Sequence, residues 1–333
     1  MSITGFLVDR FGRQHTDLRI SVTDRCNIRC VYCMREDGVE FRPHCEILAF
    51  EEIRRFVEVS ARLGIREVRL TGGEPLVRKD VCRLVEMLAR VPGVDDLSMT
   101  TNGVLLSEYA GPLKAAGLDR LNISLDTLDR QRFHQITRRD ELPSVLDGIA
   151  AACRVGFQNI KLNALAIRDQ TDAEVVPLAR FAREHGIELR FIEFMPFDAD
   201  DQWKADRVLT GEEILALLTE AFGPLEPVAR DGSRAPASQY RLPGGGPAIG
   251  LISTVTDPFC EHCSRLRLTA EGKLRNCLFS TEEWDARAVL RDGGSDEQLA
   301  RLIRDAVGAK KEKHGSDSGR FARTDRSMHQ IGG

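Results

Sequence analysis

The sequence lacks the features that mark several common classes of protein. No apolar run in its 333 residues approaches the roughly 18 residues of a membrane span. Residues 1–11 lack the basic start and apolar core of a signal peptide. Lys plus Arg number 47 and Asp plus Glu number 51, so the net charge is only −4. We therefore expect a cytoplasmic protein with neither a membrane nor nucleic acid as its main partner.

Cysteine, by contrast, is abundant: the chain has nine. Six of them form two tight groups, Cys26, Cys30, Cys33 and Cys260, Cys263, Cys277. In a cytosolic chain, such grouping indicates ligation of a metal or a cluster rather than disulfides. Of the rest, Cys82 and Cys153 lie on apolar faces of expected helices and are predicted to be core residues, and Cys45 is not assigned.

The first half of the chain alternates short β-like runs with amphipathic stretches. The expected strands are 18–22, 67–71, 97–101, 121–125, 160–164 and 189–194. We expect a helix to begin at Ser144, and another to begin with a capping box formed by Thr171 and Glu174. Six β-then-α units predict an α/β fold with parallel strands, either a doubly wound sheet or a partial (β/α)6 barrel. Polar residues gather after the strands, where such barrels carry their chemistry, which favours the barrel.

The pattern changes after Phe197. A helix is expected at 211–222 and strands at 249–254 and 264–269, with Gly-, Pro- and Ser-rich stretches between them. We interpret this part as a smaller appended region and not another repeat. The expected division is a barrel at 10–200, a C-terminal region at 201–309 and a tail at 310–333. The tail has six basic and three acidic residues, and its composition alone predicts a solvated segment.

Each cysteine group supplies three thiolates. Three can hold three corners of a [4Fe–4S] cubane and leave one iron open to a further ligand. For the first group, zinc with Cys45 or His44 as fourth ligand is the alternative, but paired C-x2–4-C elements are more typical of zinc. For the second group, a zinc knuckle completed by His262 or a distant residue matches the residues as well as a cluster does.

The first group resembles the signature of the radical S-adenosylmethionine (SAM) superfamily, with Tyr32 before the last cysteine. The resemblance implies a TIM-like partial (β/α)6 barrel and a [4Fe–4S] cluster whose open iron chelates SAM. It also implies that the motif from Gly72 to Pro75 contacts the amino group of the methionine part of SAM. The Glu74 carboxylate is suited to accept a hydrogen bond from that ammonium group. The SAM-binding residues that it implies are Tyr32, Gly73, Ser124 and Met195.

Nearly the whole chain further resembles the GTP 3′,8-cyclase family, through motifs at 17–21, 69–75, 100–103, 190–196 and 263–267 and the terminal Gly332-Gly333. The resemblance implies a second [4Fe–4S] cluster that holds the purine of GTP. It implies that both glycines reach the active site with Arg265 and Arg267, which alternate in a strand and so share one face. The implied GTP contacts are Arg19, Arg69, Thr100, Lys161, Arg265 and Arg267, with Arg190 as a further candidate.

The same resemblance implies a reaction and partners. SAM would yield a 5′-deoxyadenosyl radical that takes hydrogen from C3′ of GTP. Closure of the C3′ radical onto C8 and reduction of the resulting aminyl radical would give (8S)-3′,8-cyclo-7,8-dihydroguanosine 5′-triphosphate. This lyase reaction is the first step of molybdenum cofactor biosynthesis. Implied partners are a flavodoxin or ferredoxin as electron donor, the downstream cyclic pyranopterin monophosphate synthase, and a second copy of the chain. The alternatives are a peptide-modifying radical SAM enzyme and a non-enzymatic zinc-binding protein.

Overall fold

The computed structural model describes residues 5–197, 203–229, 236–314 and 326–332. Its centre is a run of six parallel strands that pair in the order of the chain. They are β1 (Asp17–Ser21), β2 (Glu67–Thr71), β3 (Asp96–Thr101), β4 (Arg120–Ser124), β5 (Ile160–Ala166) and β6 (Glu188–Glu193). These bounds lie within two residues of the expected strands, because runs of Ile, Leu, Val and Phe mark each one.

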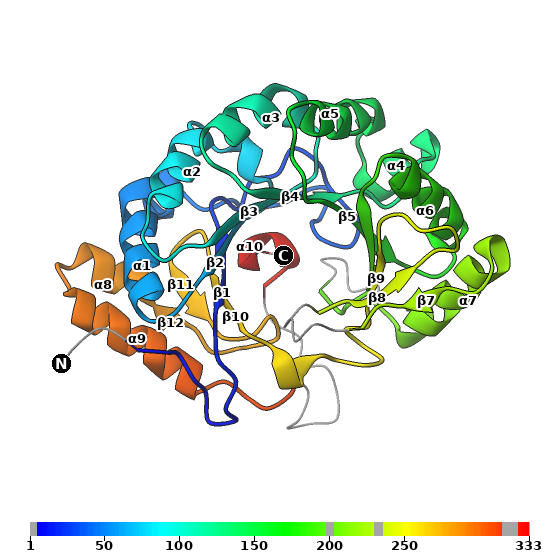
Figure 1. Ribbon diagram of the computed structural model, residues 1–333. Helices are drawn as coiled ribbons and strands as arrows, with labels where there is room; N and C mark the ends of the chain where they lie inside the picture. Colours follow the sequence, from blue (N-terminus) through cyan, green and yellow to red (C-terminus); the bar gives the residue numbers. More distant parts are fainter. Residues whose placement is uncertain (1–4, 198–202, 230–235, 315–325, 333) are drawn as a thin grey trace.

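The helices that connect these strands lie on the outer face of the curved sheet (Figure 1). They are α1 (Phe50–Arg62), α2 (Val81–Ala89), α3 (Leu106–Ala115), α4 (Arg130–Thr137), α5 (Leu142–Arg154) and α6 (Val175–Glu184). Short 3-10 helices lie at His44–Glu46, Pro75–Val77 and Asp172–Glu174. A doubly wound sheet reverses its strand order and carries helices on both faces. Sequential pairing with helices on one face confirms the partial barrel.

The C-terminal region adds strands to both edges of this sheet. At one edge β9 (Ile249–Ile252) pairs parallel to β6, and at the other β10 (Arg265–Leu268) pairs parallel to β1. Beyond them lie antiparallel β8 (Ser238–Arg241) and β7 (Glu226–Pro227) on one side, and β11 (Lys273–Arg275) and β12 (Trp284–Asp285) on the other. The region is not a further β-then-α repeat, as expected. It nevertheless forms one continuous sheet with the barrel.

The remaining helices follow these strands. They are 3-10 helices at Ala205–Arg207 and Cys260–His262, and the α-helices α7 (Gly211–Phe222), α8 (Ala286–Arg291), α9 (Asp296–Gly308) and α10 (Met328–Ile331). The short α10 lies on the concave side of the sheet, near the middle of the barrel (Figure 1). In the described residues, no helix has both the length and the apolar character that a membrane span requires.

Three local expectations were wrong. The helix expected from Ser144 begins two residues earlier, at Leu142. Thr171 forms no capping box: its Oγ1 accepts from the Ile167 N–H and donates to the Leu165 carbonyl, both at 2.8 Å, and so closes the loop after β5. Cys153 is exposed on α5, because it lies beside rather than on the stripe that packs against the sheet.

Candidate functional site

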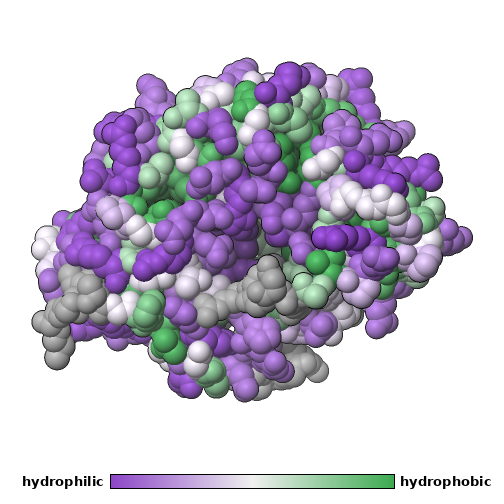
Figure 2. Space-filling view, in the orientation of Figure 1, coloured by the Kyte–Doolittle hydropathy of each residue, from purple (hydrophilic) through white to green (hydrophobic). Residues whose placement is uncertain are grey.

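A cavity of about 1010 Å³ opens on the concave side of the sheet. This is at the upper end of the size usual for small-molecule sites. Hydrophilic side chains surround the hollow in the middle of the face shown in Figure 2. All six grouped cysteines line the cavity, as do the other residues expected to bind SAM or GTP: Arg19, Tyr32, Arg69, Gly73, Thr100, Ser124, Lys161, Met195, Arg265 and Arg267.

The first cysteine group occupies the loop that leaves β1. Burial, opposed by little positive charge, raises the pKa of Cys26 to about 11 and that of Cys33 to about 12. Burial and then the neighbouring Cys33 raise the pKa of Cys30 still further. Buried thiols ionise when a metal or cation takes up their negative charge. Three such thiols on one loop therefore fit a cluster whose irons supply that charge.

Gly72 and Gly73 hold this loop in place from β2. The Gly73 N–H donates to the Thr23 carbonyl at 2.7 Å, and the Glu74 N–H donates to the Arg25 carbonyl at 2.8 Å. A Cβ on Gly72 would lie 2.5 Å from the Thr23 oxygen, and one on Gly73 would lie 2.3 Å from the Arg25 oxygen. The glycines are needed here because two backbone segments touch directly.

Glu74 has a structural role in addition to the one that the resemblance implies. Glu74 is only 1% exposed. It accepts from Leu76 N–H at 3.0 Å, Thr101 Oγ1 at 2.7 Å and Asn102 N–H at 2.6 Å. Burial raises its pKa to about 7 despite these donors. The carboxylate thus ties the loop after β2 to the end of β3, while Glu74 also lines the cavity and its Oε2 keeps capacity for a further donor.

Two cavity residues, Asp126 and Asn102, were expected at the polar rim but were given no role from the sequence. Tyr32 donates its hydroxyl to Asp126 Oδ2 at 2.6 Å, and the Leu165 N–H donates to Oδ1 at 2.8 Å. Burial raises the pKa of Asp126. The Asn102 amide lies 3.7 Å from Cys26 Sγ. Both follow strands at the rim that the sequence marked as polar, and that position was the available signal.

The second cysteine group comes together across the hairpin of β10 and β11. Cys263 precedes β10, Cys277 follows β11, and Cys260 lies in the 3-10 helix Cys260–His262. His262 is exposed, whereas His314 Nδ1 lies 3.1 Å from Cys260 Sγ. Burial would raise the pKa of Cys263, but Lys310 and then Arg265 outweigh it and lower that pKa to about 7.

Neither cysteine group is arranged as a site for one ion. In the described ranges, no three Cys, His, Asp or Glu side chains converge on a point where a single metal would lie. His44 and Cys45, offered above as zinc ligands, are exposed. The donor sets consist of thiols only, apart from His314, and thiols are the ligands that iron–sulfur clusters use.

Three arginines form a row across adjacent strands on the cavity side. Arg19 in β1 is in register with Arg69 in β2 and with Arg267 in β10. Burial lowers the pKa of Arg69 and of Arg267 to about 10. Burial and then the neighbouring arginines lower that of Arg19 further. Within the described chain, Arg19 Nε and Asp17 Oδ1 are buried without hydrogen-bond partners. Like charges placed opposite one another are destabilising, so this row is suited to an anionic ligand.

A second cationic pair lies across β5 and β6. Glu188 Oε1 accepts from Arg190 Nε at 2.6 Å, and Glu188 Oε2 lies 3.1 Å from Lys161 Nζ. Burial, then Arg190, lowers the pKa of Lys161. One carboxylate therefore neutralises only part of the charge of two cavity-lining cations.

The solvated tail expected from composition is not found at residues 326–332. Ile331 packs with Phe197 and Phe279, and the Gly332 carbonyl accepts a hydrogen bond from Arg267 Nη1. Gly332 does not itself line the cavity but contacts the ends of β1 and β2. Gly333 lies outside the described residues. The tail therefore docks against one of the arginines of the row.

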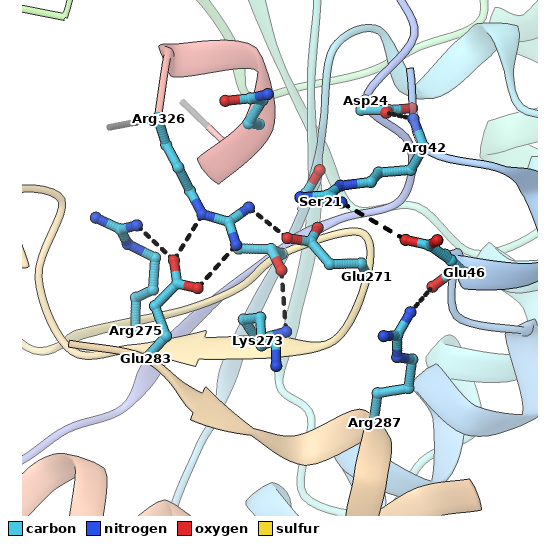
Figure 3. Close-up of polar contacts among 12 residues, drawn as sticks. Ser21, Asp24, Arg42, Glu46, Glu271, Lys273, Arg275, Glu283, Arg287 and Arg326 are labelled. Carbon is cyan, nitrogen blue, oxygen red and sulfur yellow. Dashed lines mark hydrogen bonds and ion pairs between the residues drawn. The ribbon is translucent and has the colours of Figure 1, made fainter. Parts of the chain in front are cut away.

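Arg326 anchors this tail to the C-terminal region. Its guanidinium pairs with Glu271, and with both carboxylate oxygens of Glu283 at 2.7 Å (Figure 3). Arg275 holds Glu283 from the other side, with Nη1 at 2.7 Å from Oε1. The Arg326 side chain is 18% exposed, so solvent screens these ion pairs little.

We expect Arg326→Met to loosen residues 326–332 and to lower turnover by about tenfold, since a partly buried ion pair that loses one partner costs on the order of 1–2 kcal/mol. Hydrogen exchange of the tail peptide measures the loosening directly. Arg130→Met is the matched control, because it removes an exposed bidentate pair with Asp140. Equal exchange in the two variants would contradict an anchoring role for Arg326.

Comparison with known proteins agrees with this geometry in both parts of the chain. The profile of the Radical SAM superfamily matches residues 20–182, and that of Molybdenum Cofactor Synthesis C matches residues 187–316. Among solved structures, Streptococcus suis SuiB bound to S-adenosylmethionine has a TM-score of 0.62 at 13% identity, covering 88% of this chain and 69% of that one. The fold is thus that of a radical SAM barrel with an added C-terminal region.

Relatives with higher identity narrow the class. A GTP 3′,8-cyclase of Rhodopirellula baltica is 53% identical over 98% of this chain and 92% of its own length. One of Rhodococcus opacus is 47% identical over 98% and 93%, and one of Streptomyces coelicolor is 45% identical over 98% and 96%. The chain belongs to the GTP 3′,8-cyclase family.

Proposed function

We propose that this protein is a lyase that converts GTP to (8S)-3′,8-cyclo-7,8-dihydroguanosine 5′-triphosphate with SAM and two [4Fe–4S] clusters. This reaction is the first step of molybdenum cofactor biosynthesis. The observation that carries the proposal is that one cavity is lined by two separate three-thiol groups and by a row of buried and half-buried arginines. Two open clusters suit two small ligands, and the arginines suit a triphosphate.

For the first cluster, we propose Cys26, Cys30 and Cys33 as ligands. When bound, this cluster and SAM supply the radical that removes hydrogen from the ribose. Gly73 and Tyr32 would shape the SAM site from the loop, and Ser124 and Met195 from the rim. The hydrogen bond from Tyr32 to Asp126 supports this role, because it fixes the ring against the wall of the cavity.

For the second cluster, we propose Cys260, Cys263 and Cys277 as ligands, next to the guanine. Arg19, Arg69 and Arg267, with Arg265, Lys161 and Thr100, would bind the nucleotide; Arg190 is a further candidate. The charge of the arginine row, which Asp17 compensates only in part, supports this placement, because an anion removes the repulsion among its members. Arg265, Arg267, Gly332 and Gly333 would complete the catalytic site.

We base the proposed domain organisation and partners on membership of the same family. Residues 10–200 would form the barrel unit, 201–309 the C-terminal unit and 310–333 the tail. The electron donor would be a flavodoxin or ferredoxin, and the product would pass to cyclic pyranopterin monophosphate synthase. We also infer a homodimer and a cytoplasmic location, where the nine thiols remain reduced.

Anaerobic incubation of the reconstituted protein with SAM, GTP and dithionite tests the function. We expect 5′-deoxyadenosine and the cyclised nucleotide in equal amounts. Omission of GTP should lower 5′-deoxyadenosine formation to background, because the radical then has no hydrogen donor in place. Absence of 5′-deoxyadenosine would contradict the radical mechanism. Its formation only with a different substrate, such as a peptide, would favour the alternative radical SAM enzyme.

A further inference from the structure

A buried lysine lies behind the second cysteine group. Lys310 follows α9 and is 3% exposed. Its Nζ donates to the Asn276 carbonyl at 2.7 Å and to the Arg265 carbonyl at 2.9 Å, and it lies 3.5 Å from Cys263 Sγ. Asn276 immediately precedes Cys277. One ammonium group therefore joins the two arms of the hairpin that carry Cys263 and Cys277.

The charge of this ammonium has no carboxylate partner in the protein as described. Its hydrogen-bond partners in the described ranges are one thiol and two carbonyl oxygens. Asp9 belongs to the neighbouring buried network, but it already pairs with Arg13 at 2.6 Å and His15 at 3.1 Å. A buried charge without a counter-ion is strongly unfavourable. A thiolate-bound cluster carries net negative charge and would be the counter-ion of Lys310.

The backbone around Lys310 is also held in place. Arg13 donates to the carbonyls of Lys311 and Glu312, both at 2.7 Å, and to that of Cys260 at 2.8 Å. The guanidinium thus ties the segment that carries Lys310 to the first cysteine of the group. Because the backbone is fixed, the ammonium cannot move away from the Cys263 sulfur without breaking several hydrogen bonds.

We propose that Lys310 is a positioning residue for the second cluster: it spaces the Cys263 and Cys277 arms and raises the reduction potential of the cluster. Reduction adds one negative charge to the cluster, and a fixed positive charge beside a ligand sulfur stabilises that charge. The inference rests on the proposed function, which requires this cluster.

The test is a redox titration followed by electron paramagnetic resonance. It is performed in a full-length variant with Cys26, Cys30 and Cys33 changed to Ser, so that only the second cluster gives a signal. In that background we expect Lys310→Met to lower the equilibrium constant for reduction at least tenfold, which is about 59 mV for one electron. Lys310→Arg keeps the positive charge, so its reduction potential should lie close to that of the parent.

Lys313→Met is the matched control. It removes the same charge three residues away, from an exposed side chain that pairs with Glu261, and solvent screens it. We expect an unchanged potential. An equal potential in Lys310→Met and in the parent would overturn the inference, as would an equal shift in the control.

If Lys310→Met loses the cluster, Lys310→Gln gives the same readout, because it keeps an N–H donor of similar reach without the charge. A parental potential in Lys310→Gln would overturn the electrostatic role. If no second cluster forms while Lys310 is intact, the proposed function fails, and the inference with it. The two failures are thus distinguishable.

Discussion

Gly73→Ala is expected to abolish binding of the first cluster and to weaken SAM binding at least 100-fold. The added Cβ would lie 2.3 Å from the Arg25 carbonyl oxygen and 2.6 Å from its carbon. Both are backbone atoms at the base of the cysteine loop, so the loop must move as a whole. Overpacking of this kind costs about 3 kcal/mol, which corresponds to roughly 100-fold in affinity. Iron content and calorimetric titration with SAM measure the two effects.

Gly111→Ala is the matched control for this change. Gly111 lies in α3, and a Cβ there would meet nothing within 4 Å. Since Ala favours helix over Gly, the control should be neutral or more stable by about 0.5–1 kcal/mol. In Gly73→Ala the second cluster should remain, because its cysteines lie on another part of the sheet. Normal SAM affinity in Gly73→Ala would show that the loop does not depend on this contact.

The barrel could be predicted from the sequence because its signals are local. Each of the six central strands is a short apolar run, and its polar rim residues follow directly in the chain. The cysteine spacing at 26–33 was likewise local. Interactions over long distances in the chain were not accessible in this way. The pairing of β10 with β1, for example, brings Arg267 beside Arg19 across almost 250 residues.

The same distinction explains the errors at individual residues. The donors to the Glu74 carboxylate could not be foreseen, because Thr101 and Asn102 lie at and just after the end of the next strand of the sheet, β3. The tail looked solvated, because Arg326 finds its acidic partners in a distant hairpin. Lys310 belonged to a basic stretch, and nothing local indicated that its ammonium is buried beside Cys263. In each case the local sequence gives the type of the residue, whereas its role depends on a contact with a residue elsewhere in the chain.

Removal of Gly332 and Gly333 is expected to lower turnover by at least about 100-fold, while both clusters and SAM binding persist. Arg267 is 5% exposed and donates to the Gly332 carbonyl. A hydrogen bond to a charged, buried group contributes up to about 3 kcal/mol, or roughly 100-fold in rate if it positions the reacting nucleotide. Parallel measurement of product and 5′-deoxyadenosine separates loss of substrate positioning from loss of radical formation.

A graded variant shows whether the docked conformation or merely the chain length matters. Gly332 has φ of +70°, and a Cβ there would lie 3.2 Å from Thr71 Oγ1 and 3.3 Å from Ser21 Cβ. Gly332→Ala should therefore cost about 1–2 kcal/mol in backbone conformation and lower turnover roughly tenfold. Gly308→Ala, where a Cβ meets nothing within 4 Å, should have no effect. Full activity of the truncated protein would show that the contact between Arg267 and the tail has no catalytic role.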